Sequence, residues 1–168
     1  MKNIKLLDCT LRDGGYYNRW DFSKNLISDY LSCMKDCSVD YIELGFRTLK
    51  NVGFKGACAY TENEFINSVI KFTEPKVGIM INGSEILNNY QYSQRNVENL
   101  FSSKIKSRLK LIRIACHYEE INKILPICDY LKKKNYTVGI NLMQISEISP
   151  TRIKEVAKTL NNSPADVF

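Results

Sequence analysis

The side chains best suited to chemistry follow the first apolar run of the sequence, residues 4–7. Asp8, Arg12 and Asp13 come directly after this run, and two consecutive glycines come next. The run predicts a short buried strand, and paired glycines let the backbone turn sharply or approach a ligand closely. Because burying an unpaired charge is costly, the charged groups must pair with one another, with a metal or with a substrate. A carboxylate and a guanidinium at the end of a parallel strand suit a metal-assisted oxyanion site; an Arg–Asp ion pair that only closes the sheet is the structural alternative.

The elements that would position these groups alternate between short apolar runs and longer amphipathic segments. Continuous apolar runs predict strands at residues 4–7, 41–44, 77–81, 109–115 and 137–142, with a sixth strand starting at 167–168. Helical periodicity predicts helices at residues 23–37, 61–72, 97–101, 118–133 and 150–160. Apolar strands separated by helices indicate a parallel sheet that is buried on both faces. A TIM barrel and an open doubly wound sheet both fit, but no G-x-G-x-x-G motif follows the first strand to support a Rossmann fold.

Three helix starts and one helix interior carry specific signals. Ser23 and Ser149 are expected N-caps, and Thr61 and Glu64 occupy capping-box positions. Pro126 lies inside the predicted helix at residues 118–133 and should kink that helix or shift its start.

Residues 7–14, LDCTLRDG, resemble the signature that opens the aldolase and acyl-CoA lyase superfamily built on a metal-dependent TIM barrel. This superfamily includes 4-hydroxy-2-oxovalerate aldolase, hydroxymethylglutaryl-CoA lyase, and the isopropylmalate and homocitrate synthases. The E-x-G-F run that begins at Glu43 is similar to the second-strand motif of the superfamily. The R-x-A-x-H run that ends at His117 is similar to the fourth-strand motif of the oxovalerate aldolases. The resemblance covers the whole chain, most strongly its first 50 residues, and implies an α/β fold, a parallel (β/α)8 TIM barrel.

A complete barrel of this kind needs about 250 residues, and this chain has 168. We therefore expect residues 1–168 to form a single domain that is the N-terminal portion of an aldolase/lyase-type barrel, with only the first five to six strand–helix units present. A fragment of this kind would leave strand edges open. Dimerisation or strand exchange across those edges would cover them, so a homo-oligomer is one expectation.

The resemblance implies roles for individual residues. Asp13 would be a ligand of a divalent metal, Mn²⁺ or Mg²⁺, because a hard oxygen donor suits either ion. Arg12 would stabilise the enolate oxygen that develops as a carbon–carbon bond breaks. Tyr16 stands where the oxovalerate aldolases carry a catalytic histidine, and it would act as acid or base if its pKa were lowered. The expected catalytic residues are Arg12, Tyr16, Glu43 and His117, and the expected substrate-binding residues are Arg12, Asp8 and Asn141.

Structural roles remain open for three of these residues. Glu43 could form an ion pair with an arginine without touching a substrate. His117, the only histidine of the chain, could be a hydrogen-bonded core residue. Asp8 could orient Arg12 or Thr10 from behind the site.

The function that the resemblance implies is metal-dependent retro-aldol cleavage of a 4-hydroxy-2-oxo acid through a pyruvate-type enolate. An acyl-CoA lyase or synthase of the same superfamily and a non-catalytic α/β binding module are the alternatives. A Schiff-base aldolase is disfavoured because no predicted strand ends in a lysine. The superfamily completes its metal site with a His-x-His pair, which this sequence lacks, so we expect the 168-residue chain alone to be inactive.

Composition narrows the partners further. The net charge of +6 comes from 24 basic and 18 acidic residues, with one dense basic run at residues 132–134. This pattern suits a small anionic oxo-acid substrate and does not indicate a nucleic-acid partner. The sequence shows no membrane-spanning run and no secretory signal. Six cysteines without a C-x-x-C pair predict a reduced cytoplasmic protein, in which Cys33 and Cys37 are small core residues rather than ligands of a soft metal.

Overall fold

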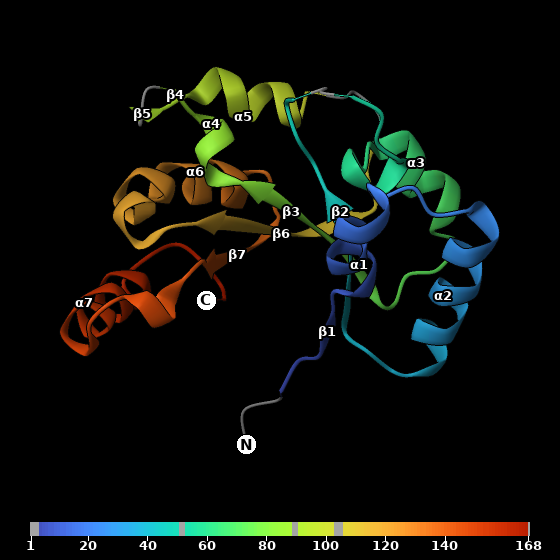
Figure 1. Cartoon of the computed structure of the whole chain (residues 1–168), viewed down its shortest axis with the longest axis horizontal. Coiled ribbons are helices and arrows are strands. Elements are labelled where there is room, and N and C mark those ends of the chain that lie inside the picture. The colour runs from blue at the N-terminus through green and yellow to red at the C-terminus, as the bar shows by residue number, and fades with distance from the viewer. Residues whose placement is uncertain (1–3, 51–52, 89–90, 103–105, 168) are drawn as a thin grey trace. The chain divides into compact units, whose positions relative to one another are not determined.

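The computed structural model describes residues 4–50, 53–88, 91–102 and 106–167. Five parallel strands alternate with helices along the chain, which confirms the predicted α/β class and a partial (β/α) barrel (Figure 1). The strands of this sheet lie in the order β1-β2-β3-β6-β7. Their bounds are β1 Leu7–Asp8, β2 Tyr41–Phe46, β3 Lys76–Asn82, β6 Leu109–Cys116 and β7 Thr137–Leu142.

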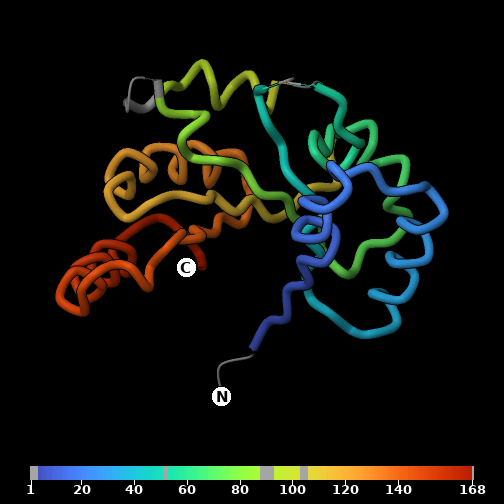
Figure 2. Tube along the Cα trace, in the orientation of Figure 1, coloured from blue at the N-terminus to red at the C-terminus, as the bar shows by residue number. Residues whose placement is uncertain are grey.

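Helices of very different length connect these strands, as the chain trace in Figure 2 shows. The helices are α1 Thr10–Asn18, α2 Lys24–Asp36, α3 Asn63–Val69, α4 Gly83–Ile86, α5 Gln94–Leu100, α6 Ile121–Lys133 and α7 Pro150–Asn161. Short 3₁₀ turns are η1 Ala57–Ala59, η2 Tyr118–Glu120 and η3 Ile145–Glu147, and an antiparallel pair is formed by β4 Leu87–Asn88 and β5 Gln91–Tyr92. No helix of the described residues has the length and apolar character that crossing a membrane requires.

The chain divides into two compact units. The first comprises Met1–Met80 and Ser103–Leu111, and the second comprises Ile81–Ser102 and Ile112–Phe168. Both units are therefore assembled from two separate stretches of sequence.

Parallel pairing and one amphipathic helix organise the first unit. Strand β1 pairs with β2, and β2 pairs with β3, in parallel register. The four central residues of β2 are buried, as expected for a strand covered on both faces. Helix α2 begins where predicted, because the Ser23 side chain accepts a hydrogen bond from the Leu26 N–H. Its apolar face buries Ile27 and Leu31.

The second unit has its own apolar core. Helix α6 buries Ile124, Ile127 and Leu131, and β7 contributes Val138. The start of α7 is as predicted, with Ser149 as N-cap and a proline in its first turn. The expected sixth strand begins as a single parallel bridge between Gly139 and Val167; residue 168 lies outside the described residues.

Two predicted features near the N-terminus are wrong. The run at residues 4–7 is not a buried strand: Ile4 is 93% and Leu6 is 57% exposed. Polar bonds hold this segment instead, because the Asp40 carboxylate accepts from Lys5 Nζ at 2.7 Å and from the Leu6 N–H at 2.8 Å. The two glycines make no sharp turn, since both lie within helix α1.

Two further expectations need correction, and one is met. Thr61 is not an N-cap; its φ is +36°, its hydroxyl donates to the Phe46 carbonyl at 2.5 Å, and Glu62 is the residue that precedes α3. Cys33 and Cys37 are exposed rather than in the core. Ile27 and Leu31 are the buried residues of α2, and Cys37 is its C-cap residue. The helix that contains Pro126 was expected either to kink or to start later than residue 118. It begins at Ile121, after a separate 3₁₀ turn, so its start is shifted.

Candidate functional site

The turn from β1 into α1 is fixed by Asp8. Its carboxylate accepts hydrogen bonds from the Thr10 N–H at 2.9 Å, the Thr10 hydroxyl at 3.1 Å and the Tyr30 hydroxyl at 2.5 Å. Partial burial would raise the pKa of Asp8, but the hydrogen bonds from Tyr30 and Thr10 outweigh it, and the pKa lies below its ordinary value of 3.8. Burial and the bond to Asp8 raise the pKa of Tyr30. Asp8 therefore orients Thr10, which is one of the structural roles that the sequence left open for it.

Replacing Tyr30 by phenylalanine is expected to destabilise the protein by about 1.5 kcal/mol at neutral pH, because a hydrogen bond to a charged group is lost. Asp8 has a lowered pKa in the folded state, so its contribution is present above its unfolded pKa and is lost as the pH falls through the folded value. Urea unfolding at about pH 7 and at acidic pH should show a smaller Tyr30→Phe deficit at the lower pH. An equal deficit at both values would show that packing, and not the Asp8 charge, is responsible.

Arg12 is held between two carboxylates. Its Nε lies 2.8 Å from Glu43 Oε2 in β2, and its Nη1 forms an ion pair with Asp13. The Glu43 side chain is fully buried, the Arg12 side chain is 14% exposed and the Asp13 side chain is 60% exposed. Burial would lower the pKa of Arg12, but the hydrogen bond and charge of Glu43, followed by the charge of Asp13, raise it above its usual value. The guanidinium is thus a fixed cation with one buried and one exposed partner.

Three aromatic rings, which we call the aromatic cluster, pack against one another beside Arg12: Tyr16, Trp20 and Phe46. The ring centroids lie 4.8 Å apart for Tyr16–Trp20, 6.0 Å for Tyr16–Phe46 and 5.5 Å for Trp20–Phe46, all edge to face. The Arg12 guanidinium carbon lies 5.9 Å from the Phe46 centroid. The Trp20 indole N–H donates to the Arg12 carbonyl at 2.9 Å, so the cluster holds the backbone and the head group of Arg12.

Sequence reasoning missed Trp20 and the bond from Tyr30 to Asp8. Gly15 explains why Trp20 fits here, because a Cβ at this position would lie 1.9 Å from the indole ring. The signal available in the sequence was a paired glycine five residues before the only tryptophan of the chain. Tyr30 gave no such signal, because its spacing in α2 fits the apolar face of a helix equally well.

A buried polar network closes the end of β2. Arg47 Nη2 donates to the Thr61 carbonyl at 2.6 Å and to Asn63 Oδ1 at 2.9 Å. Thr61 donates in turn to Phe46. All three network residues are buried, so the backbone that carries Phe46 is fixed on both sides.

The remaining predicted residues belong to the second unit. The His117 backbone N–H donates to the buried Glu120 carboxylate at 2.9 Å, and His117 is the N-cap residue that precedes η2. Asn141 Oδ1 accepts a hydrogen bond from Arg113 Nη2 at 2.6 Å. The first unit thus brings together Arg12, Asp13, Tyr16 and Glu43, with Asp8 at the base of the same helix. A shared site that also includes His117 and Asn141 stays a prediction.

The described residues offer few ligands for a metal ion. Among the described residues, no group of three or more His, Cys, Asp or Glu side chains could hold one. Asp13 offers one exposed carboxylate that is paired with Arg12, and the Asp8 carboxylate accepts hydrogen bonds from Thr10 and Tyr30. These residues do not by themselves fit a catalytic metal.

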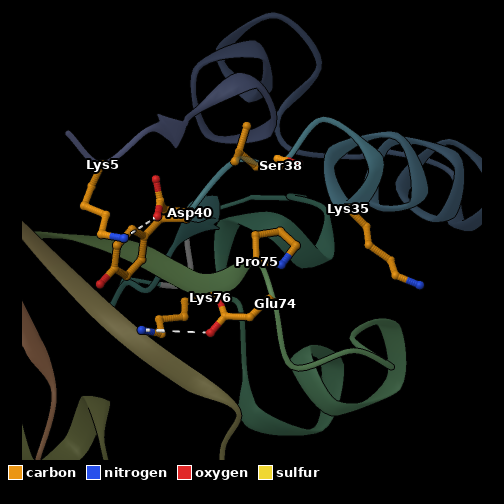
Figure 3. A pocket seen from close by; sticks show the side chains of 9 residues that line it. Lys5, Lys35, Ser38, Asp40, Glu74, Pro75 and Lys76 are labelled. Atoms are coloured by element: carbon orange, nitrogen blue, oxygen red, sulfur yellow. Dashed lines mark hydrogen bonds and ion pairs between the residues drawn. The ribbon is translucent and has the colours of Figure 1, made fainter. Parts of the chain in front are cut away.

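A separate hollow of about 390 Å³ lies at the N-terminal ends of β2 and β3 (Figure 3), and Arg12 does not line it. Lys5 and Asp40 form an ion pair across it. The bond to Asp40 raises the pKa of Lys5, and the bond from Lys5 lowers the pKa of Asp40. Lys76 lies 3.9 Å from Glu74 on the other side. Opposite charges are therefore paired within this hollow, which fits a surface that ties the N-terminal segment to β2.

Comparison with known proteins agrees with the fold. No protein-family model and no curated protein sequence matches the chain. Among solved structures, the chain is similar to the crystal structure of the N-terminal domain of a "putative aldolase" from Bacteroides vulgatus, with a TM-score of 0.77 and 24% sequence identity. The match covers 98% of this chain and 62% of that chain, so this chain spans less than two thirds of that structure. At this identity the similarity establishes the fold alone.

Proposed function

We propose that this chain is part of a carbon–carbon lyase that cleaves a 4-hydroxy-2-oxo acid by a retro-aldol reaction. The observation that carries the proposal is the Arg12 guanidinium, which a buried carboxylate holds in place where α1 follows β1. A preorganised cation stabilises negative charge that develops in a transition state without reorganising at that moment. The similarity to the Bacteroides vulgatus structure supports this class of function.

Two side chains of the first unit would take part in the cleavage reaction. Arg12 would hold the enolate oxygen as the bond between C3 and C4 of the substrate breaks. Tyr16 lies one helical turn further along α1, and the residue is 64% exposed. In its phenolate form it would accept the proton from the substrate 4-hydroxyl. The C3–C4 bond would then break, so that C4 leaves as an aldehyde and the C1–C3 fragment becomes the pyruvate enolate. His117 and Asn141 are proposed to contribute from the second unit.

Arg12→Lys in the full-length protein tests this proposal. Lysine keeps the charge but loses the planar fork of the guanidinium, so kcat should fall roughly 10²-fold with KM little changed. The assay is pyruvate release from a 4-hydroxy-2-oxo acid, and the thermal midpoint is measured on the same preparation. Normal turnover in a destabilised variant would make Arg12 a structural residue and remove the observation that carries the proposal.

We also propose Asp13 as one ligand of Mn²⁺ or Mg²⁺ in the longer protein. One carboxylate leaves most coordination positions to water, so residues 1–168 should bind Mn²⁺ only weakly. Calorimetric titration of the chain with Mn²⁺ should show no micromolar affinity. Micromolar binding that Asp13→Asn abolishes would show that other side chains of this chain complete the site.

A further inference from the structure

We propose that the aromatic cluster and Lys55 form a binding surface for 2-oxo acids that carry an aromatic ring. The inference rests on the proposed function for one point, which is that the ligand is a 2-oxo acid. It adds that this acid carries an aromatic substituent. The ring of the ligand would pack against Tyr16, and its carboxylate would lie at Lys55.

The first observation is the exposure of a rigid ring. Tyr16 is 64% exposed, although its edge-to-face contacts with Trp20 and Phe46 hold it on two sides. Within the described residues its hydroxyl has no hydrogen-bond partner, so the ring is fixed by packing alone. An aromatic side chain that is already ordered loses little entropy when a flat ligand packs against it.

The second observation is the placement of Lys55. The backbone before η1 is docked on the end of α1, because the Gly56 N–H donates to the Arg19 carbonyl at 2.9 Å. A Cβ at Gly56 would lie 2.1 Å from the Trp20 carbonyl oxygen, so only glycine allows this approach. As a result, Lys55 Nζ lies 5.7 Å from the centroid of the Trp20 ring.

Charge decides which cation takes the carboxylate. Two carboxylates, from Glu43 and Asp13, already pair with Arg12. Lys55 forms no ion pair with any described residue, and its ammonium group lies over the Trp20 ring. A ligand carboxylate therefore gains more at Lys55 than at Arg12. A short acid such as pyruvate would meet the ammonium group but leave the rings in water, whereas an aromatic acid would cover both.

The single tryptophan of the chain makes this surface directly observable. We would titrate residues 1–168 with 2-oxo-4-phenylbutanoate and with 2-oxobutanoate, following Trp20 fluorescence and the heat of binding. The phenyl compound should bind roughly tenfold more tightly, the scale of one buried aromatic contact. Equal affinity for the two acids would overturn the proposal.

Matched variants separate the parts of the surface. Tyr16→Ala should weaken binding of the phenyl compound roughly three- to tenfold, whereas Tyr16→Phe, which keeps the ring, should not. Tyr17 is 95% exposed and outside the cluster, so Tyr17→Ala is the control. Lys55→Gln should weaken both acids roughly two- to fivefold, with the exposed Lys24→Gln as its charge control. Equal losses in a variant and its control would refute the assigned contact.

The outcome is independent of turnover. If the phenyl compound binds as expected but the full-length protein releases no pyruvate, the surface stands and the lyase proposal fails. If pyruvate is released but the two acids bind equally, the lyase proposal stands and the aromatic surface fails.

Discussion

Glu43→Ala is expected to lower the free energy of unfolding by about 3–5 kcal/mol, the cost of breaking a buried ion pair by removing one partner. Glu43 is fully buried in β2, and its Oε2 lies 2.8 Å from Arg12 Nε. The variant leaves a guanidinium that is only 14% exposed without its main counter-charge, and it leaves a cavity beside the strand. Equilibrium urea unfolding at neutral pH measures the effect.

Asp13→Ala is the matched control, because it removes the other carboxylate from the same guanidinium. The Asp13 side chain is 60% exposed, so this loss should be within about 1 kcal/mol. Similar losses for the two variants would show that the buried position of Glu43 confers no special stability on the pair.

Gly45→Ala is expected to cost about 3 kcal/mol, the upper range for overpacking a core. A Cβ on Gly45 would lie 1.8 Å from the carbonyl oxygen of Cys58 and 2.7 Å from its carbonyl carbon. Backbone atoms cannot rotate away as a side chain can, so η1 would have to move away from β2. The measurement is the thermal midpoint, together with the urea midpoint.

Gly78→Ala provides the comparison within the next strand. Its Cβ would lie 3.2 Å from the Cβ and Cδ2 atoms of Leu111, so Leu111 would need to shift by only a few tenths of an ångström. We expect a loss of at most about 1 kcal/mol. If Gly78→Ala were the more damaging change, the close approach of β2 and η1 could not be the reason that Gly45 is required.

Patterns that depend on burial alone predicted most of the fold. Strands β2, β3, β6 and β7 appear as apolar runs because a parallel strand is covered on both faces. Helix α2 was found within one residue at each end, because its serine cap is a local signal. The errors lie where a distant residue decides the outcome. Asp40 holds the exposed residues before β1, and no local pattern contains that contact.

The sequence predicted which residues make up the candidate site but not the hydrogen bonds that hold them in place. The motif placed Arg12, Asp13 and Glu43 near one another, and the structure shows the two ion pairs that join them. It could not show that Tyr30 engages Asp8 or that Trp20 holds the Arg12 carbonyl. The first contact depends on where α2 lies relative to β1, and the second on how the chain folds back after α1 ends. Sequence spacing determines neither. The metal, the substrate and the roles of His117 and Asn141 stay predictions.

The discontinuous first unit has a consequence for the order in which the protein is made. Its last segment arrives late: the Lys106 carbonyl accepts from Asn67, and Leu111 packs over Gly78. Ribosomes add about 5–20 residues per second, so residues 1–80 emerge on the order of seconds before this segment does. During that interval Arg12 and Glu43 have both been translated, yet the apolar surface of β3 lacks its cover. The nascent chain is therefore most vulnerable to aggregation after its candidate site has been synthesised and before β3 is covered.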